Sequence, residues 1–87
     1  MDIRVSDAPE RRRYEVTVDG EPAGFSQYLL DGTTVTFVHT EVDPRFEGKG
    51  VGSALVGGAV TDARARGLQV VPVCPFVRSW VAKHPVT

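Results

Sequence analysis

The chain has 87 residues, with 10 basic and 11 acidic side chains, and its formal net charge is −1. This length fits one domain with a modest hydrophobic core. The near-even charge balance gives no general attraction to nucleic acid or to a membrane surface. The one basic cluster, Arg11-Arg12-Arg13, is expected to be a solvated strand edge, because no other basic segment extends it.

Cysteine content and apolar runs limit the cellular setting. Cys74 is the single cysteine, so an intramolecular disulfide is impossible and a reducing compartment fits best. No apolar run approaches the roughly 18 residues of a membrane span, and the first residues lack the apolar core of a signal peptide. We therefore expect a cytoplasmic protein without nucleic-acid or membrane partners, folded as one domain over residues 1–87.

The N-terminal half predicts an antiparallel meander that follows a short lead-in over residues 1–9. The pairs Asp19-Gly20 and Asp31-Gly32 are hairpin turn signals. The segments around them alternate polar and apolar side chains or are rich in β-branched residues, as in half-buried strands. The expected strands cover residues 12–18, 23–30 and 33–42.

In the C-terminal half, the spacing of the apolar residues changes from that of a strand to that of a helix. Apolar residues recur at helical spacing over residues 51–66, and Gly67 is expected to end this helix. A strand over residues 68–73 should run parallel to the third strand through a right-handed crossover, and Pro72 predicts that it pulls away near its end. A short amphipathic helix follows Pro75. The fold class is α+β, in the order β-β-β-α-β-α.

Three alternating glycines, Gly48, Gly50 and Gly52, precede the long helix and make a phosphate site at its start the leading interpretation. A Walker loop fails because Asp43 stands at its first glycine position. A Rossmann fingerprint fails at Ser53 and follows the wrong kind of strand. A glycine-rich turn that merely lets a helix begin is the plainer alternative.

The segment Glu47-Gly-Lys-Gly-Val-Gly-Ser-Ala-Leu55 resembles the acetyl-CoA motif of the GNAT N-acetyltransferase superfamily, Gln/Arg-x-x-Gly-x-Gly/Ala. Gly50 and Gly52 match its small residues, and Glu47 departs from its first position. A shifted register that begins at Arg45 also satisfies the pattern. Further segments from about Tyr14 to Pro85 are similar to the small single-domain, YidJ-like branch of this superfamily.

This resemblance implies how the cosubstrate acetyl-CoA would bind. Its pantetheine arm would lie in a V-shaped gap between the strands that end at Val42 and Val73. It would pair with the backbone of Glu41 to Asp43, which makes Val42 and Asp43 cofactor-binding residues. Its pyrophosphate would bind the loop residues Gly48, Lys49, Gly50, Val51, Gly52 and Ser53.

Three residues are candidates for catalysis. Glu41 resembles the general base of many GNAT enzymes, and His39 is expected on the same strand face as Glu41, Val35 and Phe37. Cys74 precedes the last helix, where a thiol pKa is lowered, and it is either a nucleophile or a residue that lines the acetyl pocket. No His, Cys or Asp cluster has metal-ligand spacing.

The leading hypothesis is an acetyltransferase that acts on an unidentified amine. A non-catalytic acyl-CoA-binding or interaction module is the rival, because the chain leaves no room for the N-terminal helices of typical GNAT enzymes. A nucleotide binder is a third reading. The acceptor stays open among polyamines, small amines, peptides and protein lysines, and exposed edge strands permit a monomer or a homodimer.

Overall fold

A computed structural model describes residues 1–85 as one five-stranded sheet with two helices, an α+β fold as expected. The sheet order is β1-β2-β3-β4-β5, and only the β4–β5 pair is parallel. Short 3₁₀ turns cover Pro9–Arg11 and Pro44–Phe46. The strands are β1 (Ile3–Ala8), β2 (Arg13–Val18), β3 (Glu21–Asp31), β4 (Thr34–Val42) and β5 (Gln69–Pro72), and the helices are α1 (Val51–Ala65) and α2 (Pro75–Lys83).

The lead-in expected over residues 1–9 is wrong for most of its length, because residues 3–8 form the edge strand β1. Val5 pairs with Val16 of β2, and its side chain packs against Gly58 of α1, where an added Cβ would lie 3.0 Å from Val5 Cγ1. The strand therefore depends on a tertiary contact with a helix that begins more than 40 residues later in the chain.

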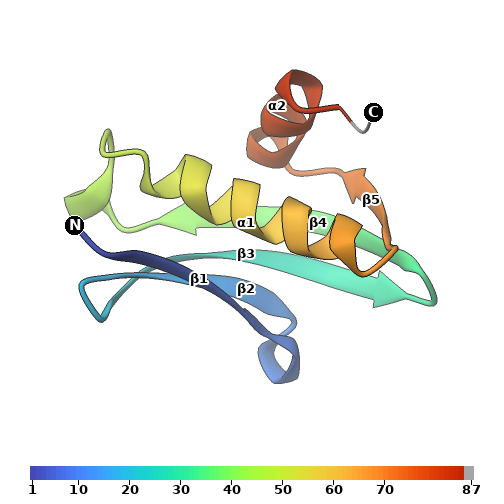
Figure 1. The fold of residues 1–87 in the computed structure, drawn as a ribbon, viewed down its shortest axis with the longest axis horizontal. Coiled ribbons are helices and arrows are strands. Elements are labelled where there is room, and N and C mark those ends of the chain that lie inside the picture. Colours follow the sequence, from blue (N-terminus) through green and yellow to red (C-terminus); the bar gives the residue numbers. More distant parts are fainter. Residues whose placement is uncertain (86–87) are drawn as a thin grey trace.

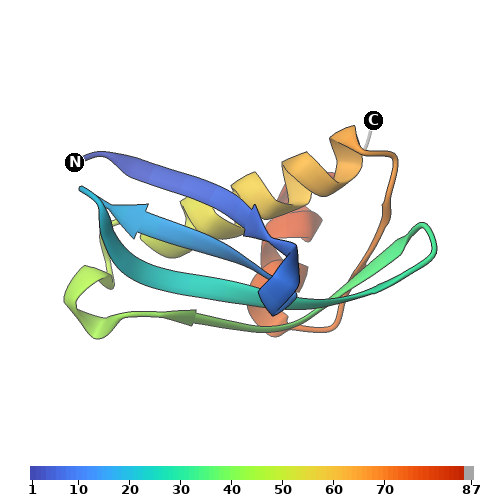
Figure 2. The ribbon, with the colours of Figure 1, turned by 90° about the horizontal axis from the view of Figure 1, so that it is seen from below.

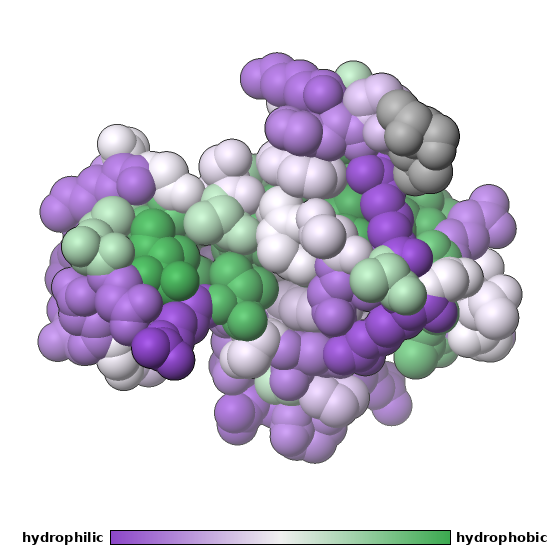
Figure 3. Space-filling model, in the orientation of Figure 1, coloured by the Kyte–Doolittle hydropathy of each residue, from purple (hydrophilic) through white to green (hydrophobic). Residues whose placement is uncertain are grey.

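Both helices cover the same face of the sheet, and the opposite face has no helix over it (Figures 1 and 2). The core lies between α1 and the strands. Phe37, Leu55 and Val60 are fully buried there. The helix comes close to its neighbours at Gly57, beside Trp80 of α2, and at Gly58, beside Val5. On the side that Figure 3 shows, hydrophobic residues reach the surface only in small separate patches.

The crossover from α1 to β5 begins at a helix end of the expected kind. Gly67 adopts a φ of 76° and donates its N–H to Arg64 O at 3.0 Å, while Leu68 donates to Ala63 O at 3.0 Å. These two bonds make a Schellman motif. They reverse the chain, so β5 runs parallel to β4, and the prediction for Gly67 is confirmed.

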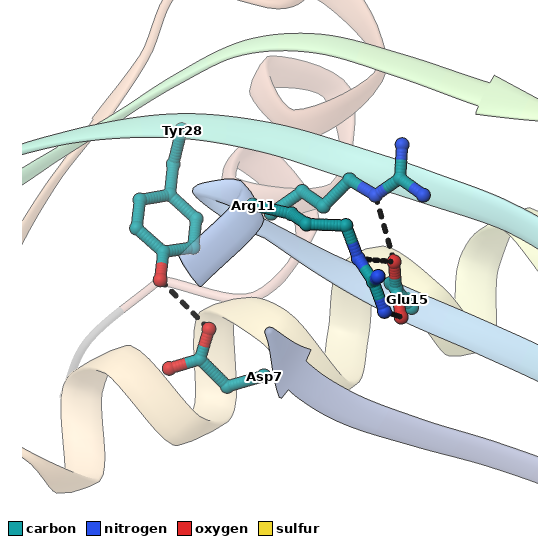
Figure 4. A network of polar contacts seen from close by, with 5 residues as sticks. Asp7, Arg11, Glu15 and Tyr28 are labelled. Atoms are coloured by element: carbon teal, nitrogen blue, oxygen red, sulfur yellow. Dashed lines mark hydrogen bonds and ion pairs between the residues drawn. The ribbon is translucent and has the colours of Figure 1, made fainter. Parts of the chain in front are cut away.

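Polar contacts also join the C-terminal end of α1 to the strands. The Tyr28 hydroxyl donates to Asp7 Oδ1 at 2.7 Å (Figure 4), and the Tyr14 hydroxyl donates to Asp62 of α1 at 2.6 Å. Arg66 forms ion pairs with both carboxylates. The basic cluster of the sequence lies nearby, where Arg11 and Arg13 both contact Glu15. No helix among residues 1–85 is long and apolar enough to cross a membrane.

Candidate functional site

The strand pair β4–β5 opens where Pro72 predicted it would. The last register pair is Phe37 with Pro72, after which Phe37 O accepts the N–H groups of Val73 at 3.1 Å and Cys74 at 2.9 Å. The chain then turns into α2. Residues 38–42 of β4 consequently continue without a β5 neighbour and leave one strand edge unpaired.

A cleft of about 590 Å³ lies beside this free edge. Its walls are the end of β4 from Thr40 to Val42, parts of the segment 46–53 that leads into α1, and Phe76 of α2. Sequence segments from both halves of the chain therefore meet at one concave surface. Among residues 1–85, no group of three or more His, Cys, Asp or Glu side chains is arranged to hold a metal ion.

The glycine loop shapes one wall of this cleft. Gly48 and Gly50 have φ angles of 76° and 78°, in the left-handed region that favours glycine. Gly50 is the N-cap of α1, and no side chain caps the helix, so its first N–H groups are available to a ligand. At Gly52 an added Cβ would lie 2.6 Å from Phe76 Cζ and 3.3 Å from Val42 Cγ2.

Within residues 1–85, negatively charged residues, and not positively charged ones, line the cleft. Glu47 and Glu41 line it, whereas Lys49 is exposed and does not. Among the described residues, the lining therefore contains two carboxylates and no lysine or arginine. Any anion in this cleft must be held by backbone N–H groups and by the helix dipole rather than by side-chain cations.

A β-bulge at Val38 overturns the expectation that His39 and Glu41 share a face with Val35 and Phe37. Tyr28 of β3 pairs with Phe37, but Gln27 pairs with His39, which leaves one extra residue on β4. An extra residue reverses which side of the sheet the later side chains face. His39 and Glu41 consequently lie on the helix-free face.

On that face, His39 Nε2 lies 2.8 Å from Glu41 Oε2, and the two side chains are 55% and 61% exposed. The His39 ring also lies beside Phe25, with ring centroids 6.1 Å apart. Glu41 lines the cleft and, in addition, a second hollow of about 260 Å³ that includes Phe25. Glu41 therefore stands at the border between two concavities, with its side chain on the helix-free face.

Asp43 follows the end of β4 but does not line the cleft. Its N–H donates to Ala23 O at 2.7 Å, and its carboxylate accepts the backbone N–H of Arg45 at 2.9 Å. The hydrogen bond from the Arg45 side chain to this carboxylate lowers the pKa of Asp43. Val42 and Ser53 line the cleft, as does Val51.

Cys74 is the N-cap residue of α2 and is only 6% exposed. Its Sγ lies 3.5 Å from Thr40 Oγ1, which in turn is 2.9 Å from Ser26 Oγ. Thr40 lines the cleft and Cys74 does not. The structure therefore adds Thr40 to the site, a residue that sequence reasoning missed because the unrecognised bulge decides which way it faces.

The surroundings of the Cys74 thiol act on its pKa in opposite directions. Burial raises the pKa, while hydrogen bonds from the Thr40 hydroxyl and from the backbone N–H groups of Val77 and Phe76 lower it. The hydrogen bonds outweigh burial, so the pKa of Cys74 lies below its ordinary value. Stabilisation of a thiolate at a helix start is the expected effect of free N–H groups.

Comparison with solved structures gives the same fold. The E. coli ribosomal-protein-S18-alanine N-acetyltransferase matches with a TM-score of 0.60 and 25% identity over 66% of this chain, which covers 38% of that enzyme. A GCN5-like candidate N-acetyltransferase from Staphylococcus aureus matches with a TM-score of 0.65 and 21% identity over 92% of this chain and 78% of its own.

The ribosomal-protein-alanine N-acetyltransferase of Brucella melitensis biovar Abortus 2308 matches with a TM-score of 0.63 and 21% identity, over 86% of this chain and 61% of that one. The chain thus spans well under half the length of the E. coli enzyme. A comparison with curated proteins gave no match. The family model described as GCN5-related N-acetyl-transferase matches residues 13–87, and the chain belongs to this family.

Proposed function

We propose that the chain binds acetyl-CoA and transfers its acetyl group to an amine, with residues 1–87 acting as one minimal domain. The observation that carries this proposal is the cleft between the unpaired end of β4 and the uncapped start of α1. A helix start binds phosphate, and a free strand edge pairs with an extended ligand that carries amide groups. Coenzyme A has both parts, a pyrophosphate and an amide-bearing arm.

The shape of the glycine loop supports this assignment. Because a Cβ at Gly52 would meet both Phe76 and Val42, bare backbone keeps the cleft open at the place where α1 begins. In the proposed complex the pyrophosphate lies against the loop from Gly48 to Ser53, which includes Lys49, Gly50 and Val51. Val42, and Asp43 beyond it, mark the end of the β4 backbone along which the pantetheine arm lies.

The proposed reaction needs a proton acceptor beside the thioester. The neutral amine nitrogen would attack the carbonyl carbon and the C–S bond would break. The nitrogen would then give up one proton, which the departing CoA thiolate would take up. Before the attack the ammonium must lose a proton, and we assign this proton to Glu41, a residue at the border of the cleft. His39, 2.8 Å away, would orient that carboxylate and pass the proton to solvent.

For Cys74, the burial of the thiol supports a positioning role. Cys74 contacts Thr40, and Thr40 lines the cleft, so the thiol would hold the hydroxyl in place beside the acetyl group. A nucleophilic role makes a different prediction. Incubation with acetyl-CoA in the absence of an amine would then produce an acetylated protein, visible by mass spectrometry and lost in Cys74→Ala.

The function is tested by amine-dependent release of free CoA thiol from acetyl-CoA. The panel should include polyamines, small amines and lysine peptides. It should also include peptides with an N-terminal alanine, because two of the structural neighbours are ribosomal-protein-alanine N-acetyltransferases. Glu41→Gln should lower turnover by roughly 100-fold or more, the usual contribution of a general base. Glu15→Gln is the matched control, since Glu15 pairs with arginines elsewhere in the sheet.

Thermal shift measurements separate the alternatives. Stabilisation by acetyl-CoA and CoA without turnover of any amine would indicate a non-catalytic acyl-CoA-binding module. Stabilisation by ATP but not by CoA would indicate a nucleotide binder. No shift with acetyl-CoA or CoA would overturn the proposed function.

A further inference from the structure

A second groove, of about 320 Å³, adjoins the cleft between the start of α1 and α2. Ser53 and Phe76 line both hollows, so the groove continues the cleft around the first turns of the helix. Its remaining walls come from α2: Ser79, Trp80, Lys83 and His84. The two helices lie side by side along it, with Phe76 against Gly52 and Trp80 against Gly57.

The two hollows differ in charge. Among residues 1–85, the charged residues that line the cleft are Glu41 and Glu47, whereas Lys83 is the one residue of fixed charge that lines the groove. Lys83 is exposed, and none of the ion pairs found among residues 1–85 involves it. Its ammonium group is therefore available to an anion.

Aromatic and polar contacts join the other walls of the groove. The rings of Trp80 and His84 stack at a centroid distance of 4.0 Å and an angle of 12°. His84 Nδ1 donates to Trp80 O at 3.0 Å, and Arg64 donates to His84 O at 2.7 Å. Each ring covers one face of the other, and the exposed His84 ring of this pair offers its outer face to a planar base.

We infer that this groove binds the nucleotide end of coenzyme A and that Lys83 contacts its 3′-phosphate. The inference rests on the proposed function, because the pyrophosphate at the glycine loop places the adenosine next to this groove. The 3′-phosphate carries close to two negative charges at neutral pH. It would find no cation in the cleft, and the ammonium of Lys83 lies in the hollow that continues it.

The test compares CoA with 3′-dephospho-CoA by isothermal titration calorimetry on the full chain. The unmodified protein should bind CoA about fivefold more tightly, which is the upper end expected for an exposed ion pair. Lys83→Gln should bring the ratio close to one without changing the affinity for 3′-dephospho-CoA. Arg4→Gln is the control, because Arg4 is an exposed cation of β1 that lines neither hollow, and it should leave the ratio unchanged.

Trp80 gives an independent readout, since it is the single tryptophan of the chain. CoA should change its fluorescence, while pantetheine, which lacks the nucleotide, should not. If the ratio is the same in the unmodified protein and in Lys83→Gln, or if CoA leaves the fluorescence unchanged, the inference is wrong although CoA binding still supports the proposed function. If neither CoA nor 3′-dephospho-CoA binds, the proposed function fails as well.

Discussion

Replacement of Gly50 by alanine tests whether the backbone of the glycine loop is the binding element. Gly50 has a φ of 78°, and an added Cβ would meet no atom within 4 Å. The substitution therefore costs only the strain of the left-handed conformation, about 1–2 kcal/mol for a residue with a Cβ. For a domain of this size, each kcal/mol lowers the melting temperature by about 4–8 °C.

Gly20, in the hairpin turn between β2 and β3, provides a matched control. Its φ is 84°, and it too has no atom within 4 Å of an added Cβ. Gly20→Ala should therefore destabilise the fold by a similar amount. We expect Gly50→Ala to weaken CoA binding at least tenfold, because the strained loop relaxes and turns the N–H groups at the start of α1 away from the cleft, while Gly20→Ala keeps the original affinity.

Calorimetric titration with CoA well below both melting temperatures separates the effects on binding and stability. Gly50→Asn should behave between glycine and alanine, since asparagine adopts the left-handed region at a lower cost than other side chains. If both alanine variants weaken CoA binding equally, the loss comes from general destabilisation. If neither does, the loop geometry has no part in binding, and the reasoning from Gly50 is refuted.

Two further predictions concern pH. Thr40→Val should raise the pKa of Cys74, because it removes a hydrogen bond that favours the thiolate. The ultraviolet absorbance of this single thiol should then titrate at higher pH. Thr40→Ser keeps the hydroxyl and should keep the original midpoint. Burial and the bond to Asp7 raise the pKa of Tyr28 to about 12, so its contribution to stability is complete below pH 10, the ordinary tyrosine pKa, and is lost as the pH rises toward 12. Urea unfolding of Tyr28→Phe should show a weaker loss of stability over this range than the unmodified chain, and an equal loss in both would contradict the assignment.

Local signals in the sequence are sufficient for much of the fold. Asp19 and Gly20 both have positive φ, as the Asp-Gly hairpin signal requires. Gly67 ends α1 in a Schellman motif, and Pro72 is the last β5 residue in register with β4. In each case one residue type has a conformational limit or freedom that few others share, so its position in the chain carries structural information without tertiary contacts.

The two errors arise where structure depends on contacts between distant segments. Residues 3–8 alternate polar and apolar side chains only at Ile3 and Val5, and the approach of Gly58 is what partly buries Val5. The bulge at Val38 lies in a run of β-branched and aromatic residues whose alternation is unbroken on either side. Nothing in that run indicates whether the later side chains stay on the same face of the sheet or move to the other face after a bulge.

The bulge also explains why the candidate site could be predicted by position and not by orientation. With a regular β4, Glu41 would lie on the helix-covered side together with Phe37, and Thr40 would point away from Cys74. One extra residue exchanges these directions. The end of β4 consequently presents Thr40 toward Cys74 on one side and Glu41 toward the helix-free face on the other.

This two-sided arrangement bears directly on how the proposed reaction would be organised. The cleft and the hollow beside Phe25 share Glu41 and Val42 as their common border. An acetyl donor held along the free edge of β4 and an amine that enters from the helix-free face would therefore meet at the strand end, with the carboxylate between them. Because neither ligand needs to pass the other, the same geometry allows the acceptor to bind while CoA occupies the cleft, which favours direct transfer over an acetylated Cys74 on the buried side.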